Sequence, residues 1–323
     1  MAEQPQDQAT KEQTLEEELA TEQLFETMPR ETRSMRQLAW HTFRRHKPAL
    51  LGLIVITLFV LSAVFAPQLT SFDPEKTDLD HMLEAPSAKH VMGTDELGRD
   101  LLTRLLYGGR VSLSIGVMAM SLAVTVGAVV GGLAGFYGGW VDNILMRFVD
   151  MMLAFPGLFI LIILSLALRD IPIERLRGTA FASIFSIVLV IAVLSWMSVA
   201  RLVRASFLSL KEQEYVIAAR SIGASNIRIM ARHLLPNAMS PIIVAATFRV
   251  ATSIITEAGL SYLGFGVQPP TPTWGNMLKN AQTFMTRAPW VAIFPGLLIF
   301  IAVVAINFIG DGLRDALDPY KVK

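Results

Sequence analysis

The stretch from Val111 to Phe136 reads VSLSIGVMAMSLAVTVGAVVGGLAGF and contains no charged side chain. About 20 apolar residues are enough for a helix to cross a bilayer, so this stretch predicts a transmembrane helix. The composition of the chain agrees, because 53% of its 323 residues are hydrophobic and 17% are charged, against roughly 45–50% and 25% in ordinary soluble domains. We therefore expect a membrane protein rather than a soluble domain.

Five further apolar segments are long enough to span a membrane. They are Ala49–Ala66, Ile144–Leu168, Thr179–Ala200, Asn237–Leu260 and Ala288–Gly310. These runs are continuous rather than alternating, which indicates membrane helices and not a β-barrel. The predicted fold class is an all-α, polytopic membrane protein with six transmembrane helices.

The distribution of charge suggests how the chain is organised. Arg44, Arg45 and Lys47 directly precede the first span, and basic residues favour the cytoplasmic side, so we expect both termini to be cytoplasmic. The expected regions are an acidic, disordered head at 1–34, an amphipathic lead-in and first transmembrane helix at 35–67, an extracytoplasmic loop at 68–110, a five-helix core at 111–310 with a cytoplasmic loop at 201–235, and a cytoplasmic tail at 311–323.

Several chemistries are excluded by what the sequence lacks. There are no cysteines, which excludes disulfides and thiolate metal sites. A net charge of +1 gives no hint of nucleic-acid binding. The chain has no phosphate-binding G-x-x-x-x-G-K-[ST] loop, no H-E-x-x-H zinc motif and no G-x-S-x-G nucleophile motif. We therefore expect no catalytic residues, no metal site and no cofactor on this chain, and any energy source must come from another subunit.

The connection between the fourth and fifth spans predicts two short helices at the cytoplasmic face. Lys211–Ile222 contains good helix formers, Gly223 can stop that helix, Ser225 can cap the next one, and Pro236 is expected to end it. One interpretation is an amphipathic pair held by lipid headgroups. The other is a docking site for a partner protein, because small side chains in this segment would let another backbone approach closely.

The spacing of the small residues resembles a known family. The string EYVIAARSIGAS at Glu214–Ser225, followed by HLLPN at His233–Asn237, is similar to the EAA loop of bacterial ABC importer permeases, which docks on the ATPase subunit. The chain departs from the general pattern at Ile217, where the family has Glu, and at His233, where it has Ile. The resemblance implies a docking role for Glu214, Tyr215, Ala218, Ala219, Arg220, Gly223, Ala224, Leu235 and Pro236.

Three other segments resemble the peptide and nickel branch of the same family. They are GTDELGRD at Gly93–Asp100, PPTPTWG at Pro269–Gly275 and GDGLRDALDP at Gly310–Pro319. Taken on its residues alone, the first segment predicts that Thr94 or Asp95 caps a short helix that follows it. The resemblance covers about Ala49–Pro319 and implies a C-type permease subunit of a dipeptide or oligopeptide importer, with the type I ABC importer permease fold.

This resemblance also implies partners and a location. We expect a second homologous permease subunit, two ABC ATPase subunits that carry ATP and magnesium, and an extracytoplasmic substrate-binding protein, all assembled at a lipid bilayer in the cell membrane. A nickel, glutathione or other small-solute importer of the same branch remains an alternative. A self-sufficient secondary carrier is the alternative from another class, and it should show internal repeats and broken helices.

Four charged residues lie within predicted spans and are candidates for pathway or structural roles. Arg147 and Asp150 are three positions apart and could pair on one helix face. Arg249 and Glu257 are eight positions apart, which puts them about 80° apart around a helix, so their pairing is not expected. Glu257 could line the pathway, cap neighbouring backbone or face the interior of the bundle.

A glycine repeat in the second span predicts close helix packing. Gly127, Gly131, Gly135 and Gly139 recur every four residues, a spacing that lets membrane helices approach closely. The contact could lie within this chain or with a partner subunit. Pro156 and Pro295 lie inside spans and are expected to kink them.

Overall fold

The computed structural model of the chain describes residues 35–169, 180–279 and 281–318, and these residues form helices and loops without a β-strand. The all-α prediction is therefore confirmed. The predicted head at 1–34 and residues 319–323 of the predicted tail lie outside the described residues.

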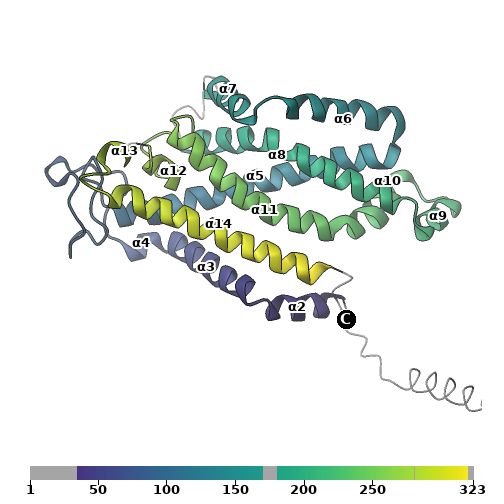
Figure 1. Cartoon of the computed structure of the whole chain (residues 1–323), viewed down its shortest axis with the longest axis horizontal. Coiled ribbons are helices and arrows are strands. Elements are labelled where there is room, and N and C mark those ends of the chain that lie inside the picture. The colour runs from purple at the N-terminus through teal and green to yellow at the C-terminus, as the bar shows by residue number, and fades with distance from the viewer. Residues whose placement is uncertain (1–34, 170–179, 280, 319–323) are drawn as a thin grey trace, which may run out of the picture.

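The long helices lie alongside one another, with their ends gathered at two opposite poles of the molecule (Figure 1). One pole carries α9 and α10, and the other carries α4, α12 and α13. The longer helices are α2 (Met35–Arg45), α3 (Lys47–Val64), α5 (Leu101–Tyr137), α6 (Gly139–Ala154), α7 (Gly157–Arg169), α8 (Ala180–Leu210), α9 (Glu214–Ser221), α11 (Leu235–Tyr262) and α14 (Trp290–Leu317). The shorter ones are α4 (Ala66–Leu69), α10 (Asn226–Ile229), α12 (Trp274–Met277), α13 (Ala281–Phe284), a 3-10 turn at Leu79–His81 and a π-helical segment at Met230–Leu234.

The described residues contain five helical stretches long and apolar enough to span a membrane, and a sixth candidate made of the bent pair α6 and α7. The two helices of this pair meet at an angle of 94°. The kink expected from Pro156 within Ile144–Leu168 is therefore present, and it divides the segment into two helices. The break lies where expected, because Pro156 cannot donate a backbone hydrogen bond and holds Phe155 in an extended conformation (φ −83°, ψ 144°).

Helix α5 is longer than the predicted second span, because it begins at Leu101 and runs for 37 residues. Residues 101–110 of the predicted extracytoplasmic segment are thus helical, and the predicted short helix is the first part of α5. Its N-cap is Asp100, whose carboxylate accepts a 2.8 Å hydrogen bond from the Thr103 amide. The expected capping by Thr94 or Asp95 is therefore wrong.

Helices α5 and α8 pack closely along the glycine repeat. A Cβ atom placed on Gly127 would lie 2.6 Å from the Cβ of Val199, and one on Gly131 would lie 2.3 Å from the carbonyl oxygen of Ala200. A Cβ on Gly135 would likewise lie 2.7 Å from the carbonyl oxygen of Arg204. These three glycines therefore serve packing within the chain.

Gly139 does not belong to this packing surface. It is the first residue of α6, has a φ of +53°, and has no neighbouring atom within 4 Å of the place where a Cβ would lie. The four-residue spacing continues into Gly139, but the helix does not, because α5 ends at Tyr137. Gly139 therefore takes no part in the packing that Gly127, Gly131 and Gly135 make within the chain.

The first two helices are fixed against the last one. Phe43 of α2, Ala49 of α3 and Ala316 of α14 form one buried cluster. Between α2 and α3, His46 caps the second helix, because its Nδ1 accepts a 3.1 Å hydrogen bond from the Ala49 amide. This packing places α2 at the pole that carries α9 and α10 (Figure 1).

Candidate functional site

The predicted two-helix connection exists, and its turn is tightly defined. Helix α9 ends in a Schellman motif, in which the Ala224 amide donates to the Ala219 carbonyl at 3.1 Å and the Gly223 amide donates to the Arg220 carbonyl at 3.0 Å. Gly223 has a φ of +83°, a conformation that favours glycine. Ser225 then caps α10 by accepting a hydrogen bond from the Arg228 amide, as predicted.

One side of this connection is anchored to the helical bundle. Val216, Ala219 and Ile229 are buried, and Val216 and Ile229 share a cluster with Val203 and Phe207 of α8. The guanidinium of Arg220 lies 6.0 Å from the centre of the Phe136 ring at the end of α5. Ala219 thus lies on the anchored side, and the expectation that it forms part of the open surface is wrong.

The opposite side of the connection is exposed and apolar. Ile217 is 54% exposed, Ile222 is 86% exposed and Ile227 is 73% exposed. Tyr215 and Ala218 are also exposed on α9. We define these five residues as the docking face, and it stands out from the pole on a turn whose geometry is fixed by hydrogen bonds.

The second predicted helix does not end at Pro236. The described chain stays helical from Asn226 to Tyr262, with the π-helical segment between α10 and α11. Leu235 and Pro236 open α11 directly after the π-helical segment. Proline removes one backbone hydrogen bond, and here the helix changes from π to α at that point instead of ending, so the expected stop at Pro236 is wrong.

Two ion pairs join α6 and α8 near the same pole. Arg204 of α8 binds Asp142 of α6 through both its Nε and its Nη2, and Arg201 binds Asp150. The expected pair of Arg147 and Asp150 is therefore wrong, because Asp150 turns to the neighbouring helix. Arg147 lies with these four residues around one open cavity. These ion pairs add to the buried apolar cluster of Met146, Val149, Met197 and Ala200 that packs α6 on α8.

Glu257 does not line an open path within this chain, because it is fully buried. Its carboxylate accepts hydrogen bonds from the hydroxyl groups of Ser261 at 2.7 Å, Thr273 at 2.9 Å and Ser112 at 3.3 Å. The three hydroxyl groups come from α11, from the loop before α12 and from α5. Of the roles left open by the sequence, the structure supports the one in which Glu257 faces the interior of the bundle and ties these segments together.

Arg249 is separate from Glu257, as the eight-residue spacing predicts. Its Nη2 donates a 2.8 Å hydrogen bond to the Ser198 hydroxyl of α8, and its side chain is only partly buried. Among the described residues, Arg249 forms no ion pair, unlike Asp150, and it is only partly buried, unlike Glu257.

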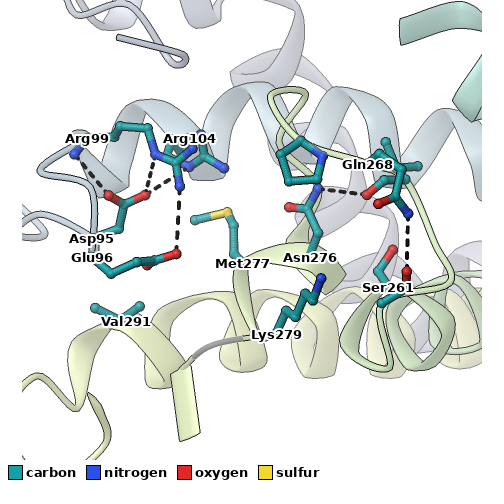
Figure 2. Close-up of a pocket in the computed structure, with 13 residues that line it drawn as sticks. Asp95, Glu96, Arg99, Arg104, Ser261, Gln268, Asn276, Met277, Lys279 and Val291 are labelled. Carbon is teal, nitrogen blue, oxygen red and sulfur yellow. Dashed lines mark hydrogen bonds and ion pairs between the residues drawn. The ribbon is translucent and has the colours of Figure 1, made fainter. Parts of the chain in front are cut away.

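The segment Gly93–Asp100 contributes to a buried cluster of charged side chains that the sequence analysis did not predict. Asp95 accepts a 2.7 Å hydrogen bond from Arg99 Nε and lies 3.3 Å from Arg104 Nε, and all three residues are buried. Figure 2 shows this cluster facing Asn276 and Lys279 across a pocket of about 90 Å³. The four-residue spacing of Asp95 and Arg99 could have indicated that these two residues pair. Nothing in the sequence indicated that Arg104 also lies beside Asp95.

Histidine and aspartate side chains also pair in the segment before α5. His81 lies 2.9 Å from Asp78, and its hydrogen bond holds the pKa of the Asp78 carboxyl below the usual value. His90 lies 3.0 Å from Asp100, the residue that caps α5. These contacts brace the segment before α5, and among the described residues no group of three or more His, Asp or Glu side chains is arranged to hold a metal ion.

The long apolar helices define the chain as a multi-pass membrane protein. A family model described as "Binding-protein-dependent transport system inner membrane component" matches residues 127–322, and one described as "N-terminal TM domain of oligopeptide transport permease C" matches residues 34–86. The chain belongs to the family of binding-protein-dependent transport system inner membrane components, which are transport subunits and not enzymes. This membership implies ATPase and substrate-binding partners.

Individual relatives are similar along most of their length. The chain is 43% identical to the dipeptide transport system permease protein DppC of Alkalihalophilus pseudofirmus over 281 residues, which cover 87% of this chain and 88% of the relative. It is 42% identical to the glutathione transport system permease protein GsiD of Escherichia coli O6:K15:H31 over 285 residues, which cover 88% and 90%. The resemblance stated from the sequence motifs is confirmed.

Proposed function

We propose that this chain is one of two permease subunits in an ATP-driven importer of dipeptides or short oligopeptides, and that it forms half of the translocation pathway. The similarity to a dipeptide permease along 87% of the chain supports the peptide substrate. The complete importer contains a second homologous permease, two ABC ATPase subunits that carry ATP and magnesium, and an extracytoplasmic binding protein that delivers the peptide.

The docking face is the single observation that carries the proposed coupling to an ATPase. Three isoleucine side chains stand exposed on a turn fixed by the Schellman motif, and the opposite side of the turn is anchored to α5 and α8. The guanidinium of Arg220, 6.0 Å from the centre of the Phe136 ring, adds to this anchoring. A rigid apolar surface of this kind suits a partner protein that pushes on the bundle.

The same proposal fixes the orientation. If the docking face meets a cytoplasmic ATPase, then α2, with Arg44 and Arg45 in its last turn, lies on the cytoplasmic side, because it is at the same pole. The described end of α14 also lies at that pole (Figure 1). We therefore place both termini in the cytoplasm, in agreement with the excess of basic residues there.

Glutathione import is the second candidate function. It is supported by the similarity to GsiD, which is nearly as great as the similarity to DppC. Glutathione is itself a small peptide, so the same pathway could accept both substrates.

Reconstitution into liposomes tests these proposals. The chain alone should not hydrolyse ATP, because it carries no nucleotide-binding motif. It should also show no uptake under a proton or sodium gradient, because it forms only half of the proposed pathway. Adding the second permease, both ATPases and a loaded binding protein should produce ATP-dependent uptake of a labelled dipeptide. Gradient-driven uptake by the isolated chain would support a secondary carrier, whereas a complete assembly that moves only glutathione or only nickel would remove the dipeptide as substrate.

A further inference from the structure

One face of α11 carries an exposed line of mostly polar and small residues, interrupted by Ile255, which is 50% exposed. Thr252, Gly259 and Tyr262 are exposed, while Arg249 and Thr256 are less fully exposed members of the same line. Consecutive members are three or four positions apart, so neighbouring members lie on the same side of the helix, and the line winds partly around α11 between Arg249 and Tyr262. We call these five residues the polar lane.

Arg249 stands at the inner end of this lane and near the middle of α11. Among the described residues its guanidinium donates a hydrogen bond to the Ser198 hydroxyl and forms no ion pair with a carboxylate. A guanidinium has five N–H donors, so a single hydroxyl leaves most of its binding capacity unused. An arginine at this depth does not face lipid, because exposing the charge to hydrocarbon is too costly, and it must face water or protein.

Apart from the exposed Ile255 beside it, the rest of the lane offers groups that water can bind. A Cβ atom added at Gly259 would have no neighbour within 4 Å, so the surface is open at that point. The hydroxyl groups of Thr252 and Thr256 donate to carbonyl oxygens of their own helix, which leaves their oxygen lone pairs on the open side. Tyr262 donates a 3.1 Å hydrogen bond to Gln282 and so continues the lane to the pole opposite the docking face.

We propose that Arg249 binds a carboxylate of the transported peptide partway along the translocation pathway, with Ser198 holding the guanidinium in place. This inference rests on the proposed function. A free C-terminal carboxylate is common to linear peptides of any side-chain composition, and the planar guanidinium matches it with two parallel hydrogen bonds. The site therefore recognises what all such substrates share, and it leaves side-chain selection to other parts of the importer.

The absence of cysteine in the chain allows a direct test by thiol chemistry. In the assembled importer in lipid nanodiscs, Thr252→Cys should react with the anionic sulfonatoethyl and the cationic trimethylammonioethyl methanethiosulfonate. Replacing Arg249 by Gln in that variant should lower the ratio of anionic to cationic reaction rates by about fivefold or more, because one nearby positive charge is lost. Arg249→Lys should preserve the ratio.

Thr57→Cys on α3 is the matched control, since Thr57 is also a threonine whose hydroxyl bonds to its own helix. It lies outside the polar lane and should be shielded by lipid from both reagents. A Thr252→Cys variant that reacts with neither reagent would overturn the proposal. If Arg249→Gln leaves the ratio of anionic to cationic reaction rates unchanged, the proposal is also overturned. That result would indicate that Arg249 is paired with a carboxylate of the second permease.

Protection by substrate gives the second readout. The dipeptide Ala-Ala at millimolar concentration should slow the reaction of the thiol in Thr252→Cys with the anionic reagent, whereas Ala-Ala amide should not, and Arg249→Gln should abolish the difference. Equal effects of acid and amide would overturn the proposal. An importer that transports peptides but shows no such difference refutes this inference alone, whereas an assembly that shows the difference but moves no peptide refutes the proposed function alone.

Discussion

Gly131 of α5 lies directly against the backbone of Ala200 of α8, so that a Cβ atom on Gly131 would be 2.3 Å from the Ala200 carbonyl oxygen. Neither group can move aside as a flexible side chain could. The two helices can therefore keep this separation only while position 131 has no side chain.

We expect Gly131→Ala to destabilise the chain, because α5 and α8 must separate or shift to admit the methyl group. Overpacking of this kind costs about 1–3 kcal/mol. Gly296→Ala in α14 is the matched control, since a Cβ there would meet no atom within 4 Å. Thermal unfolding of both variants in detergent, followed by loss of monodisperse protein, measures the effect. Equal unfolding temperatures for the two variants would contradict the packing role.

Gly223→Val should uncouple transport from ATP hydrolysis. Valine rarely adopts a φ of +83°, and there is open space around position 223, so the variant acts through backbone strain and not through a steric clash. Gly223→Asn is the control, because asparagine tolerates this conformation better than other residues. We expect uptake to fall severalfold in the valine variant and to persist in the asparagine variant, with both inserted in the membrane. Full uptake by Gly223→Val would remove the argument for a rigid docking turn.

The spans and the docking turn could be predicted because their signals are local. A run of apolar residues such as Val111–Phe136 indicates a membrane helix whatever lies beside it. Gly223 and Ser225 act through hydrogen bonds to residues a few positions away, and the structure confirms both predictions. Pro156 likewise breaks the chain locally, although its sequence context could not reveal a bend as large as 94°.

The predictions that failed concern contacts between segments far apart in the sequence, or the positions of helix ends. Asp150 has Arg147 one turn away, but it binds Arg201, which is 51 positions away and becomes a neighbour only when α6 packs on α8. Gly139 continues the glycine spacing, yet α5 ends two residues before it. The partners of Glu257 come from three segments, and hydroxyl groups give no sequence signal for such a meeting.

Removing the carboxylate of Glu257 should destabilise the pole that carries α12. In Glu257→Leu, the hydroxyl groups of Ser112, Ser261 and Thr273 lose their common acceptor while they stay buried, which costs about 1–3 kcal/mol for each group that finds no other partner. Glu257→Gln keeps one acceptor oxygen in nearly the same volume and should be milder. Unfolding temperatures in detergent compare the two. A leucine variant as stable as the wild type would show that the three hydrogen bonds contribute little.

Cysteine labelling should show that the docking face and the opposite pole lie on different sides of the membrane. Ile222→Cys and Val91→Cys place single thiols at positions that are 86% and 61% exposed. In intact cells, an impermeant maleimide should label the thiol at position 91 and spare the thiol at position 222, and permeabilisation should expose both. The reverse pattern would overturn the orientation and, with it, the meeting of the docking face with a cytoplasmic ATPase.

Arg204 and Asp142 should be exchangeable only as a pair. The guanidinium holds the carboxylate through two nitrogens, one of them at 2.6 Å, and this contact ties α6 to α8 close to the docking turn. Arg204→Asp alone places two carboxylates in contact, and Asp142→Arg alone does the same with two guanidinium groups, so each single variant should lose most ATP-driven uptake. The double exchange restores opposite charges and should recover a substantial part of that uptake, since the attraction does not depend on which helix carries which sign. Uptake in proteoliposomes, normalised to the amount of inserted protein, separates this effect from poor expression. Single variants that transport normally would show that the pair is dispensable, and a double variant no better than the singles would show that the residues act through other partners.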